Sequence, residues 1–226
     1  MAAKSRGSVR PENEMRERIV DAALELGEAL GWEAVRLYDV AEAAGLGLED
    51  IRRHFKEKEA ITDAWFDRAD RALLEAAGDP EVMALPSRER LHRLIMAWLE
   101  ALAPHRRVTR EIIWNRLEPG HLHVQLPSVL RISRTVQWIR EAARREATFL
   151  RRAIEETALT GIFVTTFCYW LRDDSQDLRD TRRVLDGLLG ALERLERGGG
   201  DARSFRGRTP PEARTEDAGA RAGAGE

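Results

Sequence analysis

Apolar residues recur at intervals of three and four over most of the chain, which is typical of amphipathic helices. The first such stripe ends before Gly31, and similar stripes run over 91–102, 129–143 and 185–195. No stretch alternates apolar and polar residues for long enough to predict a β-strand. The residues of the first stripe are Met15, Ile19, Ala23, Leu26 and Leu30. The sequence therefore predicts an all-α fold.

Helix-breaking residues and changes in composition divide the chain. Gly78-Asp79-Pro80 and Pro86 separate a first group of helices from a second. The last 29 residues are rich in Gly, Ala, Arg and Pro with one large apolar residue, Phe205, so they bury too little to offset their ordering entropy. We expect a flexible arm over 1–11, a first domain over 12–61, a second domain over 62–197 and a disordered tail over 198–226.

The most informative stretch lies between residues 31 and 61. Two short helices fit it, over about 37–44 and 48–55, and Gly45-Leu46-Gly47 forms a tight turn between them. Leu48, Ile51 and Phe55 are expected to face inward because they recur at helical spacing. A short helix, a glycine turn and a second short helix form the helix-turn-helix arrangement.

This stretch resembles the TetR family of ligand-responsive repressors. The matching residues are Gly31-Trp32, Asp39-Val40-Ala41, Ala44-Gly45 and the run Ile51–Phe55, which Lys58-Glu59 follows. The resemblance implies an N-terminal DNA-binding domain, a helical domain that binds a ligand and dimerises, and a homodimer that releases a palindromic DNA operator when ligand binds. The residues of this chain that would then contact DNA are Arg36, Tyr38, Arg52, Arg53, His54 and Lys58.

The second predicted helix departs from the family pattern in its charge. Glu49, Asp50 and Arg52 stand where the family usually has a small residue, a threonine and a tyrosine. Residues 1–60 hold ten Lys or Arg against thirteen Asp or Glu, and the whole chain has a formal net charge of −2. Because non-specific DNA affinity depends on neutralised phosphates, we expect little of it here. A strongly basic protein that coats nucleic acid is excluded.

Aromatic residues gather in the predicted second domain. They could line an apolar pocket between helices, or they could simply fill the core. Gly45-Leu46-Gly47 is not a phosphate-binding loop, because it lacks the third glycine and follows no strand. The set therefore favours an apolar small molecule or lipid as ligand, with candidate residues Trp98, Trp114, Trp138, Phe163, Phe167 and Trp170.

A second resemblance leaves an alternative open. Residues 169–189 look like the closing helices of the lipid-binding accessory proteins of ubiquinone biosynthesis, which share the TetR fold. The alternative is therefore a lipid-binding accessory protein of isoprenoid quinone metabolism that does not read DNA. Proteins of that family end in an amphipathic membrane-binding helix. The last residues of this chain contain almost no large apolar side chains, so membrane docking is not expected.

Other chemistry has little support in the sequence. The single cysteine, Cys168, lies in an apolar run and is expected to be a small core residue. His121 and His123 form only a weak metal motif, and no nucleophile stands at a recognisable spacing from a base. We expect no enzyme activity, cofactor or metal. The apolar runs fall short of the roughly 20 residues of a membrane span, and the basic N-terminus lacks an apolar core, so a cytoplasmic protein is expected.

Overall fold

The computed structural model describes residues 6–117, 134–143 and 149–206. Helices make up most of these residues, and there is no strand among them, which confirms the all-α prediction. The N-terminal part contains α1 (Arg6–Leu30), η1 (Trp32–Ala34), α2 (Leu37–Ala44) and α3 (Leu48–His54). Further along the chain lie α4 (Lys58–Ala77), α5 (Pro80–Ala84), α6 (Ser87–Leu102), η2 (Ala103–His105), α7 (Arg106–Leu117), a helical stretch over 134–142, α9 (Phe149–Trp170), η3 (Gln176–Leu178) and α10 (Arg179–Arg206).

The terminal helices are longer than the sequence pattern indicates. α1 begins at Arg6, so residues 6–11 of the expected arm are helical, and α10 continues to Arg206, into the expected tail. Both extensions continue a packed helix, and adding residues to an existing helix is easier than starting one. The rest of the expected arm and tail, residues 1–5 and 207–226, lies outside the described residues, as do 118–133 with His121 and His123.

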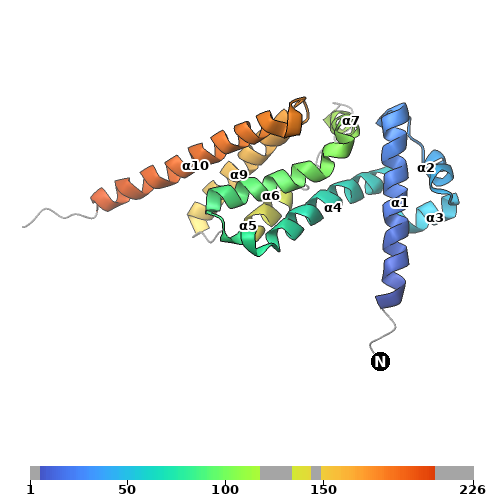
Figure 1. Cartoon of the computed structure of the whole chain (residues 1–226), viewed down its shortest axis with the longest axis horizontal. Helices are drawn as coiled ribbons and strands as arrows, with labels where there is room; N and C mark the ends of the chain where they lie inside the picture. The colour runs from blue at the N-terminus through green and yellow to red at the C-terminus, as the bar shows by residue number, and fades with distance from the viewer. Residues whose placement is uncertain (1–5, 118–133, 144–148, 207–226) are drawn as a thin grey trace, which may run out of the picture.

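Figure 1 shows how the helices are arranged. α1 stands across one end of the molecule with α2 and α3 beside it, and α4 leads from there into the second group of helices. α4 packs along α6, and α10 lies against both α6 and α9. α4 therefore connects the two groups through its own packed side chains, which include the buried Trp65, Phe66, Ala69 and Leu73.

α1 and α7 approach each other very closely at Gly27. A Cβ atom on Gly27 would lie 3.0 Å from Cγ1 of Val108 and 3.3 Å from Cε3 of Trp32. Val108 is fully buried at this contact, and Ile112, four residues further along α7, is buried as well. The absence of a side chain at Gly27 thus lets α7 join the core of the N-terminal group.

Two sequence expectations about burial were wrong. Leu48 is 55% exposed, although Ile51 and Phe55 are buried as expected. α3 ends at His54, and Phe55 has an extended backbone. The burial of Phe55 therefore does not result from the helical spacing between Leu48 and Phe55. Cys168 is exposed because Phe163, Phe167 and Trp170 occupy the inward face of α9.

The turn between α9 and α10 is organised around one carboxylate. Asp173, 4% exposed, accepts hydrogen bonds from the backbone N–H groups of Ser175 (2.8 Å) and Thr181 (2.9 Å) and from the Thr181 hydroxyl. Asp177 and Leu178 both adopt left-handed backbone conformations, with φ of 54° and 55°. Asp173 therefore holds together the segment in which this unusual backbone occurs.

Candidate nucleic-acid interface

The helix-turn-helix prediction matches the observed elements closely. Gly45 ends α2 in a left-handed conformation (φ 65°) that suits glycine, and its N–H donates to the Glu42 carbonyl. Gly47 then stands directly before α3, and the Asp50 carboxylate accepts a hydrogen bond from its N–H at 3.2 Å. The inward faces of the two helices carry Val40, Ala41, Ala44 and Ile51, all buried.

The opposite face of this unit is open to solvent. Tyr38 of α2 is 60% exposed, and Leu48, Arg52 and Arg53 of α3 are exposed as well. His54, at the end of α3, is half-buried. Four of the six expected DNA contacts, Tyr38, Arg52, Arg53 and His54, thus come from two adjacent helices, and three of these four are exposed.

Arg53 is paired within its own helix. Its guanidinium lies 3.1 Å from the Asp50 carboxylate and 3.8 Å from that of Glu49. The Arg53 and Glu49 side chains are 62% and 92% exposed, so solvent screens these pairs and they contribute little to stability. The pairing places an acidic counter-charge beside one of the two exposed arginines of α3.

Arg36 and Lys58 are engaged in local structure instead. The Arg36 guanidinium donates to the Glu33 carbonyl at 2.6 Å. The Lys58 ammonium donates to the carbonyls of Trp32 and Val35, and it lies 4.8 Å from the Trp32 ring centre. Burial lowers the pKa of Lys58, and the nearby Arg36 charge lowers it further. Lys58 therefore ties η1 to the start of α4.

Two arginines of α1 that the motif did not single out fix the ends of the motif helices. Arg16 donates to the carbonyl of His54 at 3.1 Å and lies over the Phe55 ring at 4.3 Å. Arg18 donates to the carbonyl of Ala44 at 2.7 Å. These arginines stabilise the C-terminal ends of α3 and α2, so much of the positive charge of this domain has a structural role. The spacing to their partners in the sequence, 38 and 26 residues, carries no signal.

Four of the six expected ligand residues come together in the second group of helices. The Trp98 ring centre lies 5.1 Å from that of Phe163 and 5.5 Å from that of Phe167, and Phe167 stacks on Trp170 at 5.7 Å. Phe66 of α4, which the sequence reasoning missed, stacks on Trp98 at 6.1 Å. These rings pack on one another and form a continuous aromatic cluster, which we define as Phe66, Trp98, Phe163, Phe167 and Trp170.

The other two expected ligand residues lie outside this cluster. Trp114 is 50% exposed and the Arg172 guanidinium lies 5.4 Å from its ring centre, while Trp138 is 43% exposed.

A buried carboxylate, Asp70, lies next to the aromatic cluster. Asp70 accepts hydrogen bonds from Nε1 of Trp98 (2.8 Å) and from the hydroxyl of Thr135 (3.0 Å).

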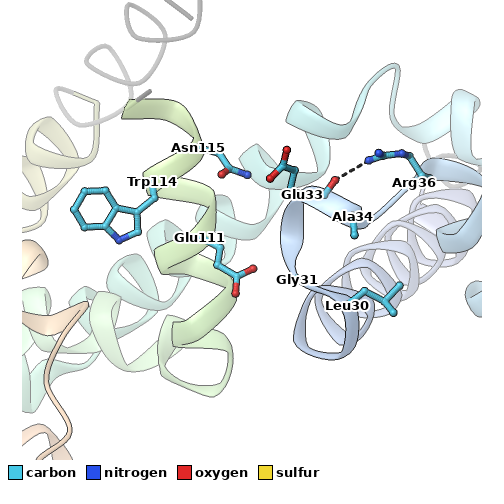
Figure 2. A pocket seen from close by; sticks show the side chains of 8 residues that line it. All are labelled: Leu30, Gly31, Glu33, Ala34, Arg36, Glu111, Trp114 and Asn115. Atoms are coloured by element: carbon cyan, nitrogen blue, oxygen red, sulfur yellow. Dashed lines mark hydrogen bonds between the residues drawn. The ribbon is translucent and has the colours of Figure 1, made fainter. Parts of the chain in front are cut away.

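A cleft lined by both polar and apolar side chains lies between the η1 segment and α7. Its volume is about 520 Å³, and it is lined by Leu30, Gly31, Glu33, Ala34, Arg36, Glu111, Trp114 and Asn115. Figure 2 shows Glu111 and Asn115 on α7 facing the η1 segment. The carboxylate of Glu111, one of the lining residues, accepts a hydrogen bond from the Trp32 N–H at 2.6 Å.

Further contacts beside the cleft also join the two groups of helices. Arg107 lies 2.9 Å from the Glu28 carboxylate and 3.5 Å from that of Glu111. The Trp65 indole donates to the hydroxyl of Thr109 at 2.9 Å. α7 is thus bonded to α1, η1 and α4 at once.

The comparisons with known proteins agree with this architecture. A crystal structure of a TetR transcriptional regulator from Nitrosomonas europaea is 48% identical in sequence and superposes with a TM-score of 0.72. That match covers 79% of this chain and 97% of the other.

The chain belongs to the TetR family of transcriptional regulators.

More distant TetR-family structures share the fold. A regulator from Rhodococcus sp. RHA1 is 19% identical over 80% of this chain and 97% of its own, with a TM-score of 0.59. The repressor FadR of Thermus thermophilus, solved with lauroyl-CoA, is 20% identical over 90% of this chain and all of its own, with a TM-score of 0.53.

One curated sequence also matches, and no family model does. It is an uncharacterized helix-turn-helix-type transcriptional regulator of Bacillus subtilis, YhgD, which is 30% identical over 107 residues. The match covers 47% of this chain, and the chain spans just over half (56%) of that relative's length.

Features of other protein classes are not seen in the part of the TetR-family chain that the structure describes. Within those residues, no three His, Cys, Asp or Glu side chains gather as a metal site would require. None of the described helices combines the length and apolar character needed to cross a membrane.

The role of Lys58 in this regulator can be tested directly. We expect Lys58→Met to lower the free energy of unfolding by about 1–2 kcal/mol, because carbonyls of Trp32 and Val35 lose a charged donor. We also expect the salt dependence of DNA binding to stay unchanged. If Lys58 contacted a phosphate, the slope of log K against log salt would instead fall by about one. Urea unfolding and fluorescence anisotropy measure the two effects.

Proposed function

We propose that this TetR-family regulator binds a palindromic duplex as a homodimer through the outer face of α2 and α3, and that an apolar ligand in the second group of helices releases it. The observation that carries the proposal is the contrast between the two faces of the helix-turn-helix unit. One face is packed, and the other presents Tyr38, Arg52 and Arg53 to solvent. A regulator of this kind acts in the cytoplasm, where its operator is.

Tyr38, Arg52, Arg53 and His54 are the proposed DNA contacts. Arg36 is exposed, and its guanidinium donates to the carbonyl of Glu33, three residues earlier. Because this bond is local and lies at the surface, Arg36 can exchange the carbonyl for a phosphate. Lys58 is the weakest candidate, since several carbonyls already hold its ammonium.

Arg53 provides the test of this interface. We expect Arg53→Ala to weaken binding to a selected duplex about tenfold, because one charged contact to a base or phosphate contributes about 1–3 kcal/mol. Anisotropy with the labelled duplex measures the loss. Arg183→Ala is the matched control, since Arg183 of α10 is similarly exposed (69%) and has the same pairing with an aspartate three residues earlier. Equal losses for both variants would contradict the proposed interface.

The ligand is proposed to be an apolar or acyl-bearing molecule that enters the aromatic cluster. The five rings are buried against one another, so a ligand that separates them would meet an apolar lining. The FadR repressor of similar fold was crystallised with lauroyl-CoA. Lauroyl-CoA and lauric acid are the probes. We expect either to quench tryptophan fluorescence in the wild type, less so in Phe167→Ala, and to release bound duplex.

The homodimer is proposed to form through α9 and α10. Both helices leave bulky apolar side chains in solvent, with Tyr169 42% and Leu195 75% exposed. Two such helices from each copy would make a four-helix interface. Sedimentation at micromolar concentration tests this, and a monomer there would contradict it.

The relatives reported above are transcriptional regulators, so they give no support to the lipid-binding accessory function, which is kept only as an outcome of these experiments. No duplex binding even at low salt, together with stoichiometric lipid extracted from the purified protein, would overturn the regulator proposal. Specific duplex binding that an apolar probe reverses would support it.

A further inference from the structure

The first turn of α3 presents two side chains that the protein itself does not use in packing. Leu48 is 55% exposed, and the Glu49 side chain is 92% exposed. Ile51, three residues on, makes the core contact of this helix. The protein therefore carries an apolar group and a carboxylate side by side at the start of its recognition helix, and neither contributes to its core.

The chemistry of base edges restricts what Leu48 can meet there. In a helix-turn-helix complex the first residues of the second helix face the bases of the major groove. The apolar group on that surface is the C5-methyl of thymine. Covering an exposed leucine with a methyl group removes apolar area from water, which favours binding.

The same reasoning restricts what Glu49 can meet. A carboxylate only accepts hydrogen bonds, and the donors in the major groove are the amino groups of cytosine and adenine. Adenine also presents its N7 acceptor next to the amino group, which repels a carboxylate, whereas cytosine presents only the donor. Glu49 therefore fits cytosine N4.

We propose that α3 selects pyrimidines with its first turn, so that Leu48 contacts a thymine methyl and Glu49 accepts a hydrogen bond from cytosine N4. The proposal rests on the proposed DNA-binding function and names the base chemistry of its operator. Arg53 lies one turn after Glu49 and 3.8 Å from it, which places a donor for guanine beside the acceptor for cytosine. The repulsion between the acidic first turn and phosphates weakens binding to every duplex. Only a duplex with the matching thymine and cytosine offsets this repulsion, so the acidic turn contributes to sequence selection.

The experiment begins with selection of duplexes from a random library by the full-length wild-type protein. We expect thymine and cytosine at fixed positions of each half-site. Each selected thymine is then replaced by deoxyuridine, which removes only the methyl group. At one position per half-site we expect affinity to fall about fourfold, which corresponds to roughly 0.8 kcal/mol for one buried methyl or methylene group.

Leu48→Ala should bind the thymine duplex more weakly and lose the deoxyuridine effect. Leu30→Ala is the matched control, because Leu30 is equally exposed (56%) but lies in the cleft beside α7. It should keep the full deoxyuridine effect. Unfolding curves that match the wild type would show that both variants fold.

Selection with Glu49→Gln tests the second contact. Glutamine donates and accepts, which suits the N6 and N7 groups of adenine. We therefore expect the selected cytosine to become adenine at that position.

The possible outcomes distinguish a failure of this base-contact proposal from a failure of the proposed DNA-binding function. If the wild type enriches no duplex, DNA binding itself fails. If it enriches a specific duplex, but no deoxyuridine position depends on Leu48 and Glu49→Gln keeps the cytosine, the regulator reads DNA and our assignment of base contacts is wrong.

Discussion

Trp98→Ala should lower the free energy of unfolding by about 3–5 kcal/mol, the usual range for a buried aromatic residue replaced by alanine. Trp98 is 3% exposed and its ring contacts those of Phe66, Phe163 and Phe167. The substitution also removes a hydrogen-bond donor to the buried Asp70 carboxylate. Both losses occur where α4, α6 and α9 meet, so the whole second group of helices should be weakened.

Urea unfolding followed by circular dichroism measures this effect. Trp114→Ala is the control, because Trp114 is half exposed and should cost less than about 1 kcal/mol. Trp98→Phe should fall between them, since it keeps most of the ring volume and loses the N–H donor. A similar cost for the alanine variants of Trp98 and Trp114 would show that the aromatic cluster is not the centre of this domain.

Asp173→Ala should cost about 3 kcal/mol, because two backbone N–H groups and the Thr181 hydroxyl would lose a charged acceptor in a buried turn. α10 begins a few residues later, so its first turn should fray. Amide hydrogen exchange at Thr181 and urea unfolding report the two effects. Asp174→Ala is the control, because the neighbouring Asp174 side chain is 92% exposed and forms a surface ion pair with Arg106.

The same carboxylate predicts a dependence of stability on pH. Burial alone would raise the pKa of Asp173, but the hydrogen bonds from Ser175 and Thr181 outweigh it and lower the pKa from 3.8 to about 2. A carboxyl group with a lower pKa in the folded state stabilises the fold above its unfolded pKa. We expect a contribution of about 2 kcal/mol above pH 4 that disappears as the pH falls towards 2. Asp173→Asn should lack this dependence, and a wild-type acid titration without it would refute the assignment.

The helix-turn-helix unit was accessible from the sequence because its signals are local. Gly45 occupies the left-handed position that ends α2, and Ile51 and Phe55 are buried as the pattern required. The prediction that Leu48 faces inward was wrong. It linked Leu48 to the buried Phe55 by helical spacing, but α3 ends at His54 and Phe55 has an extended backbone.

The roles of charged and aromatic residues were harder to predict because they depend on distant partners. Lys58 contacts carbonyls 23 and 26 residues away, and Asp70 meets Trp98 and Thr135 across three helices. Six aromatic residues looked equivalent in the sequence, yet Trp114 and Trp138 lie outside the aromatic cluster. Composition identifies aromatic residues, but only tertiary packing shows which of their faces are buried.

The close contact of Gly27 with Val108 joins α1 to α7 near the C-terminal end of α1. Van der Waals contact holds α7 against α1 there, and the Glu111 bond to Trp32 holds it against η1, so we expect a tilt of α7 to be passed on to α1. Arg16, which donates a hydrogen bond to the end of α3, lies on the N-terminal side of Gly27 in α1. At the 1.5 Å rise per residue of a helix, about 16 Å separate the two residues along the axis. A tilt of about 10° at Gly27 would therefore move the end of α3 by roughly 3 Å, close to the rise of one base pair in B-DNA. A small rearrangement around α7 would in this way be enough to shift α3 out of register with the bases.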